Sequence, residues 1–147
     1  MNAPDQATSH GGGDVRLETL DRYDAWRLLT EAASVEGIAR VVWSSGTGPA
    51  IVPVNFTVAD GSLWFQVAAG SRLAMECAGQ RVVVEVDSAD AASHTGWSVI
   101  VTGEARTMRA SEDPGLLGGL QVWPGGDRQQ LVQVEPSEIT GRRLRHR

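Results

Sequence analysis

Short β-rich runs separated by turn residues follow one another from residue 38 onward, and their spacing limits the folds open to this chain. In residues 81–87, Val82, Val84 and Val86 alternate with residues that point the other way, which is typical of a strand. We predict six strands, over residues 38–43, 50–58, 62–68, 81–87, 97–108 and 129–135. Because long helices do not alternate with these strands, the pattern favours an antiparallel barrel or sandwich over a parallel doubly wound sheet.

Turn signals connect and interrupt the predicted strands. Asp60-Gly61 is a strong hairpin signal between the second and third strands. Gly103 predicts a bulge or a bend within the fifth strand, and Pro136 is expected to end the sixth. The other predicted elements are short helices over 72–78 and 111–120 and loops over 88–96 and 123–127.

One longer helix is expected before the first strand, over residues 21–33. Asp21 is its predicted N-cap and Gly37 its predicted stop. Residues at spacings of three to four predict one face that packs on the sheet, formed by Tyr23, Trp26, Leu29 and Ala33.

The composition limits the classes of function. The net charge of −5 gives no basic field that would attract nucleic acid or an anionic membrane. The chain has 13 lysine and arginine residues, and all of them are arginine, which excludes Schiff-base chemistry on a lysine. Cys77 is the one cysteine, so an intrachain disulfide is excluded and no metal site is expected.

The length of 147 residues suits one domain with its own core. We expect a disordered N-terminal tail over residues 1–16, a single domain over 17–143 and a basic tail over 144–147. The first residues lack the apolar run of a signal peptide, and no segment is apolar over the ~20 residues that a membrane span needs. A cytoplasmic location is therefore expected.

No set of side chains in the sequence is typical of acid–base or nucleophilic catalysis. His94 is the one histidine inside the predicted domain, so no catalytic residue is assigned, and a cofactor is expected to carry any difficult chemistry. Gly70-Ser71-Arg72 begins a predicted helix after a strand, where backbone N–H groups, a hydroxyl and a guanidinium could bind phosphate. Two interpretations stay open, because Ser71 could instead only cap the helix while Arg72 is solvated.

Several short motifs follow one another in a characteristic order. They are Val52-Pro53-Val54-Asn55-Phe56, Gly70-Ser71-Arg72-Leu73, Val84-Glu85-Val86-Asp87, Gly96-Trp97-Ser98-Val99, Thr102-Gly103-Glu104-Ala105 and Ile139-Thr140-Gly141-Arg142-Arg143. Their order over about residues 17–143 resembles the pyridoxamine 5′-phosphate oxidase-like split-barrel family, above all its short actinobacterial flavin-binding members and its nitroimidazole-resistance branch. The resemblance implies a six-stranded antiparallel split β-barrel that forms a homodimer and binds FMN between two subunits.

The resemblance also implies which side chains contact the cofactor. The implied cofactor-binding residues are Pro53, Val54, Asn55, Gln66, Val67, Ser71, Arg72, Trp97 and Ser98. The first three would line the isoalloxazine ring, Ser71 and Arg72 would hold the phosphate, and Trp97 and Ser98 would come from the region that closes the site. Ordinary core packing is the alternative role for Val54 and Trp97.

Gln66 and Val67 depart from the family pattern, because relatives often carry an arginine and a threonine there that contact the phosphate. A charged hydrogen bond contributes ~1.5–3 kcal/mol, so losing one or two would weaken FMN binding about ten- to a thousandfold. The deazaflavin F420 is therefore the alternative cofactor. Asn55 stands where some relatives have histidine, and it cannot act as a general base.

The expected function is that of an FMN-binding protein and flavin-dependent oxidoreductase, which transfers hydride to or from a small substrate. Two alternatives stay open. One is a non-catalytic binding protein for FMN, F420 or another ligand on the same barrel. The other is a dimeric module without a cofactor, in which the five tryptophans act as core and interface anchors.

Overall fold

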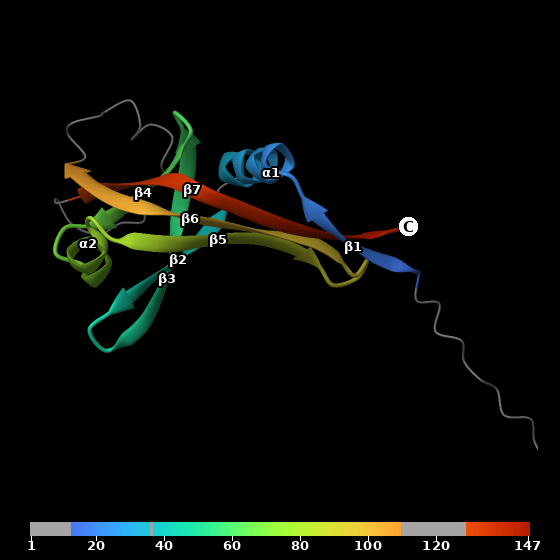
Figure 1. Cartoon of the computed structure of the whole chain (residues 1–147), viewed down its shortest axis with the longest axis horizontal. Helices are drawn as coiled ribbons and strands as arrows, with labels where there is room; N and C mark the ends of the chain where they lie inside the picture. The colour runs from blue at the N-terminus through green and yellow to red at the C-terminus, as the bar shows by residue number, and fades with distance from the viewer. Residues whose placement is uncertain (1–12, 36, 110–128) are drawn as a thin grey trace, which may run out of the picture.

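A computed structural model describes residues 13–35, 37–109 and 129–147, and it shows an antiparallel sheet that closes on itself (Figure 1). The strands are β1 (Val15–Leu20), β2 (Ile38–Ser45), β3 (Gly48–Ala59), β4 (Ser62–Ala68), β5 (Arg81–Asp90), β6 (Thr95–Arg109) and β7 (Gln129–His146). The helices are α1 (Arg22–Ser34) and α2 (Arg72–Cys77). The order β7-β4-β3-β2-β5-β6 returns to β7, which confirms the predicted six-stranded antiparallel barrel, and β1 is a further strand paired with β7.

The last strand, β7, is longer than predicted and holds three partners together. Its first part pairs with β4 and its last part with β1, while β6 pairs along most of its length. The prediction that Pro136 ends this strand was wrong. A register shift between Thr102 and Gly103 places Pro136 at a β-bulge, where a residue without an N–H is tolerated. The strand pairing is irregular at Gly103, as predicted, but the extra residue of the bulge, Ser137, lies in β7 and not in β6.

The structure corrects three further predictions. β1 was missed, and it begins at Val15, inside the segment predicted to be a disordered tail. It pairs with the final residues of β7, so residues 144–146, predicted as part of a basic tail, are strand. The predicted loop 88–96 shrinks to residues 91–94, because β5 and β6 form a longer hairpin. The helix predicted over 111–120 and the loop predicted over 123–127 lie outside the described residues.

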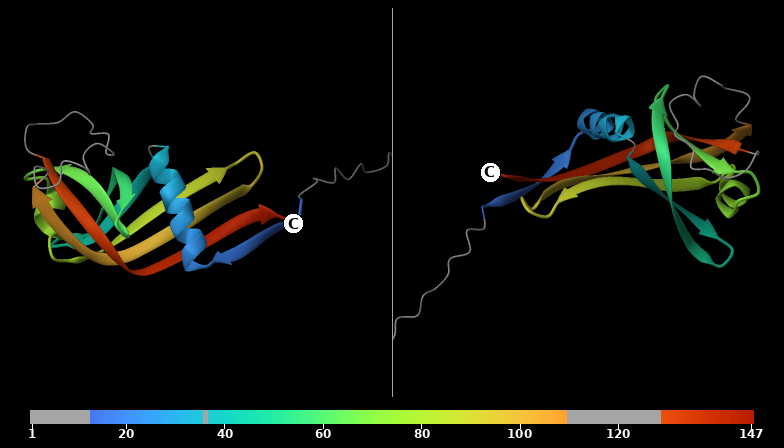
Figure 2. Two further views of the ribbon diagram at one scale, coloured as in Figure 1. Left: turned by 90° about the horizontal axis from the view of Figure 1, so that it is seen from above. Right: turned by 180° about the vertical axis from the view of Figure 1, so that it is seen from behind.

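The core fills the barrel, and α1 packs against β3 and β7 (Figure 2). Asp21 caps α1 as predicted, since its Oδ1 accepts the Asp24 N–H at 2.8 Å. Trp26 packs partly buried against the core, as expected, but Tyr23 is 77% exposed and does not share the packed face. The buried residues of α1 are Ala25, Leu28 and Leu29. Within the described residues, no helix has the length and apolar character needed to cross a membrane.

Candidate functional site

β3 leaves part of one edge unpaired, and this opening positions the candidate site. Along residues 48–55, β3 pairs with β2 on one side. Among the described strands, β4 pairs with the other side of β3 only from Phe56 to Ala59, next to the Asp60-Gly61 turn. Both turn residues have positive φ, 51° and 71°, which is typical of a tight type I′ hairpin turn. Beyond the turn, β4 continues along β7 and leads into α2.

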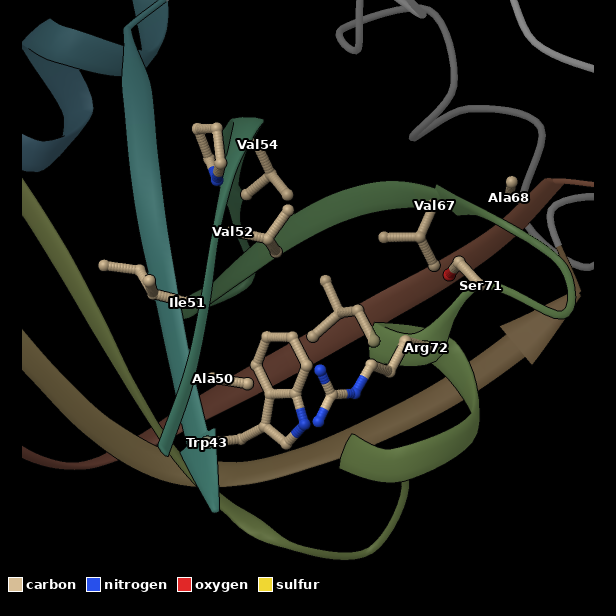
Figure 3. A pocket seen from close by; sticks show the side chains of 11 residues that line it. Trp43, Ala50, Ile51, Val52, Val54, Val67, Ala68, Ser71 and Arg72 are labelled. Carbon is tan, nitrogen blue, oxygen red and sulfur yellow. The ribbon is translucent and has the colours of Figure 1, made fainter. Parts of the chain in front are cut away.

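A cavity of about 490 Å³ lies between the open edge of β3 and the beginning of α2 (Figure 3). We call it the β3–α2 cavity. It is lined by Trp43, Ala50, Ile51, Val52, Pro53, Val54, Val67, Ala68, Ser71, Arg72 and Leu73. Most of these side chains are apolar, and the polar groups gather at the α2 end. A cavity of this size, with apolar walls and a few grouped polar atoms, is typical of small-molecule sites.

Ser71 begins α2 as its N-cap. Gly70 precedes it with a φ of 80°, which lets the chain turn from the strand into the helix. The Oγ of Ser71 accepts the Ala74 N–H at 3.2 Å, and the Ser71 N–H donates to the Ala68 carbonyl at 3.1 Å. The capping interpretation is therefore confirmed. It leaves the hydroxyl hydrogen of Ser71 able to donate to a ligand, because a hydroxyl both accepts and donates.

Arg72 lies at the centre of a hydrogen-bond network that joins α2 to the β2–β3 hairpin. Its Nε donates to Glu76 Oε1 at 3.0 Å. Its Nη2 donates to Ser45 Oγ at 2.6 Å and to Thr47 Oγ1 at 3.0 Å. Figure 3 shows the guanidinium beside the indole of Trp43. The network fixes the direction in which Arg72 points, so Arg72 is not simply solvated.

Glu76 completes this network and stays ionised. Its Oε2 accepts the indole N–H of Trp43 at 2.8 Å, and Trp43 is only 5% exposed. The hydrogen bond from Trp43, followed by that from Arg72, lowers the pKa of Glu76, although partial desolvation acts in the opposite direction. The carboxylate therefore neutralises Arg72 beside the cavity.

The nine residues expected to bind the cofactor do not lie together. Five of them line the β3–α2 cavity, namely Pro53, Val54, Val67, Ser71 and Arg72. Asn55 and Gln66 are not among the lining residues, and the Gln66 Oε1 is buried without a hydrogen-bond partner among the described atoms. Trp97 and Ser98 line a different cavity. Val54 and Trp97 also pack, partly buried, against the core, so the packing role considered for both is present.

The second cavity, which we call the β5–β6 cavity, has a volume of about 550 Å³. It lies at the far end of the β5–β6 hairpin and is lined by Leu17, Asp87, Ser88, Ala89, Asp90, Ala91, His94, Thr95, Gly96, Trp97, Ser98, Arg142 and Leu144. Its charged side chains include two carboxylates and one guanidinium. Hydrogen bonds from Ser93 and Ala92 lower the pKa of Asp90, so this carboxylate stays ionised.

Sequence reasoning missed four residues of the Arg72 network, namely Trp43, Ser45, Thr47 and Glu76. Glu76 carried a signal, because it stands four residues after Arg72, and charged residues at this spacing on a helix are neighbours. The other three come from a strand and a turn distant in sequence. No local pattern connects them to α2.

Known proteins resemble the chain over most of its length. Rv0080 of Mycobacterium tuberculosis, an uncharacterized protein, is 37% identical over 132 residues, which cover 85% of this chain and 84% of that protein. An FAD-binding protein from Mycobacterium smegmatis has 33% sequence identity, and its structure matches with a TM-score of 0.71. The match covers 87% of this chain and 100% of the M. smegmatis chain. A candidate 5-nitroimidazole antibiotic resistance protein from Bacteroides thetaiotaomicron shares the fold, with a TM-score of 0.65 and 13% sequence identity. The match covers 92% of this chain and 95% of the B. thetaiotaomicron chain.

The family follows from one further match. A sequence model described as pyridoxamine 5′-phosphate oxidase matches residues 21–143, a segment that includes the whole of β2 to β6 and most of β7. The resemblance drawn from the motifs is therefore confirmed, and this chain belongs to the pyridoxamine 5′-phosphate oxidase family.

Proposed function

We propose that this chain binds a flavin in the β3–α2 cavity. The observation that carries the proposal is the open edge of β3 beside the Arg72 network. Backbone N–H and C=O groups along this edge can meet the polar rim of a flat ring, and apolar side chains can cover its faces. The FAD-binding relative at 33% identity supports a flavin as the occupant.

The residues of the cavity fit such a ligand. Pro53, Val54 and Val67 would pack against the ring system, and Ser71 and Arg72 would bind the phosphate at the α2 end. Contacts from Asn55 and Gln66 stay a prediction, since neither residue lines the cavity. FMN and F420 stay the cofactors expected from the sequence, and the FAD-binding relative adds FAD to the candidates.

We also propose that two copies of the chain complete the site. Trp97 and Ser98, expected to close it, lie in the β5–β6 cavity of the same chain and not in the β3–α2 cavity. A second copy could bring its β5–β6 region to the flavin. Large apolar side chains support such an interface, because Ile38, Ile51 and Ile100 are 48%, 64% and 42% exposed.

The bound flavin would supply hydride transfer, and the protein would bind, orient and shield the ring. Oxidoreductase activity is therefore the function that we propose for the complete site. A non-catalytic flavin-binding protein is the second candidate. The lining of the β3–α2 cavity favours this second candidate. Arg72 is the one charged residue among the described lining residues. No side chain there could therefore act as an acid or base near neutral pH.

Absorbance spectra and activity assays separate these possibilities. We expect the purified protein to bind added FMN, FAD or F420, which would shift the absorbance of the ring. We expect the loaded protein to oxidise a reduced nicotinamide cofactor by accepting its hydride on the bound ring. Binding without turnover would favour the non-catalytic protein. Unchanged spectra with all three cofactors would overturn flavin binding and favour the cofactor-free module.

A further inference from the structure

We propose that the β5–β6 cavity binds a small zwitterion with an apolar side chain, such as a free α-amino acid. Asp87 on β5 would bind the ammonium group of this ligand, and Arg142 on β7 would bind its carboxylate group. The inference goes beyond the proposed flavin site and does not depend on it, because the two cavities share no lining residue.

Strand pairing places the main lining residues of this cavity on one face of the sheet. Residues directly opposite each other on neighbouring strands point to the same face. One row across β5, β6 and β7 consists of Asp87, Ser98 and Arg142. The next row, nearer the hairpin turn, consists of Ala89, Gly96, Leu144 and Leu17. Val86 and Val99, which alternate with these residues, are buried in the core, so both rows lie on the outer face.

The two ends of the first row carry opposite charges that are not paired with each other. Arg40 Nη1 donates to Asp87 Oδ1 at 3.2 Å and to Glu85 Oε2 at 3.1 Å, so these three side chains together keep one negative charge. Asp87 Oδ2 accepts no hydrogen bond from the described residues. Arg142 forms no ion pair or hydrogen bond with them either. Both groups can therefore bind a ligand.

The separation of these charges suits a ligand that carries both signs. Neighbouring strands are about 4.8 Å apart, so the Cα atoms of Asp87 and Arg142 are roughly 10 Å apart, with Ser98 between them. A ligand with one charge would leave one of the two groups unpaired, whereas a zwitterion pairs with both. The other carboxylate of the cavity, that of Asp90, already accepts the Ala92 N–H at 2.9 Å within the hairpin turn. Asp87 is thus the carboxylate left for the ammonium group.

The second row offers an apolar surface to the rest of the ligand. Leu17 and Leu144 lie opposite each other on β1 and β7, and they are 58% and 42% exposed. Beside them, Ala89 and Gly96 leave space above the sheet, because one side chain is a methyl group and the other is missing. The volume of about 550 Å³ is within the usual range of small-molecule sites. A large apolar side chain, such as that of phenylalanine, would pack on the two leucines.

Isothermal titration calorimetry with three related ligands tests the inference. L-Phenylalanine carries both charges, 3-phenylpropanoate lacks the ammonium group and 2-phenylethylamine lacks the carboxylate group. We expect L-phenylalanine to bind the wild-type protein about three- to tenfold more tightly than either analogue, because each analogue loses one charge pair that is partly exposed to water.

Two variants separate the two charges. Arg142→Gln should remove the advantage of L-phenylalanine over 2-phenylethylamine and keep its advantage over 3-phenylpropanoate. Asp87→Asn should do the reverse. The matched controls are Arg143→Gln and Glu138→Gln, which change an arginine and a carboxylate of β7 that do not line the cavity. Both controls should keep all three affinities.

Two results would overturn the inference. One is a wild-type protein that binds either analogue as tightly as L-phenylalanine, and the other is a wild-type protein that binds none of the three ligands. If Arg142→Gln or Asp87→Asn does not fold, the comparison of the ligands in the wild-type protein decides. Flavin binding is measured separately by absorbance, so a failure here leaves the proposed flavin site intact, and a failure of the flavin site leaves this result intact.

Discussion

Arg72 is the side chain on which the candidate site most depends. It brings a permanent charge to the cavity, and three hydrogen bonds fix its direction. The Gly70-Ser71-Arg72 motif was enough to find it from the sequence, because a serine N-cap followed by an arginine is a local pattern. Apart from Glu76, its partners could not be found in the same way. Ser45 and Thr47 come close only because the β2–β3 hairpin folds toward α2.

Arg72→Ala should weaken the binding of FMN, FAD and F420 about ten- to a hundredfold, because a charged hydrogen bond contributes ~1.5–3 kcal/mol. The phosphate would lose the guanidinium and meet the unneutralised carboxylate of Glu76. Riboflavin affinity should stay unchanged. Fluorescence-quenching titrations measure both effects.

Arg27→Ala is the control for this variant, since it also removes an arginine that pairs with a glutamate four residues later. It should leave all affinities as they are. Equal losses for riboflavin and for the nucleotides in Arg72→Ala would contradict a phosphate-binding role and would instead indicate that the cavity had collapsed.

At the scale of the elements, the sequence predicted where the strands lie better than it predicted where each strand begins and ends. Alternating valines and the Asp60-Gly61 turn gave β4 its observed bounds and placed β3 and β5 correctly. Errors arose where pairing with distant segments extends a strand. β7 passes Pro136 because it bulges at Ser137, opposite Thr102 and Gly103 of β6, and β1 is a strand because β7 lies beside it. Such partners are not visible in a local pattern.

Gly103 of β6 lies opposite the bulge in β7, where the two backbones come close together. A Cβ at this position would collide with the carbonyl oxygen of Glu135, so the two backbones approach closely only because residue 103 is glycine. Gly103→Ala should lower the free energy of unfolding by about 1–3 kcal/mol, the usual cost of forcing extra atoms into a packed site. Urea denaturation monitored by tryptophan fluorescence measures this loss.

Gly46→Ala is the matched control, because a Cβ there has nothing within 4 Å. Its unfolding midpoint should stay close to that of the wild-type protein. If both variants unfold at the wild-type midpoint, the close approach of β6 and β7 would not contribute to stability.

At the scale of the whole molecule, no described helix or strand packs on the outer face of the sheet formed by β3, β2, β5 and β6. Ile38, Ile100 and Ile51 are exposed on it, whereas Val41, Val84, Val99 and Val101 of β2, β5 and β6 point into the core. The barrel that the sequence predicted is present, and the dimer expected from the resemblance stays a prediction. It could not predict that Trp97 and Ser98 would lie in another cavity of the same chain, since that separation follows from how the long β5–β6 hairpin extends away from α2.

Ile100→Arg tests whether this surface joins two copies. Ile100 is 42% exposed and lines neither cavity, so an arginine there should leave each cavity intact. We expect light scattering after size exclusion to show a dimer for the wild-type protein and a monomer for the variant, because the interface would have to bury a longer, charged side chain in place of an apolar one. If the second copy completes the site, flavin affinity should fall about tenfold or more in the monomer.

Tyr23→Arg is the control, because Tyr23 is 77% exposed on α1 and lies outside this sheet surface. It should remain dimeric and bind flavin like the wild-type protein. A dimeric Ile100→Arg protein would show that this surface is not the interface. A monomeric one with wild-type flavin affinity would show that one chain holds the flavin alone, and Trp97 and Ser98 would then have no part in the site.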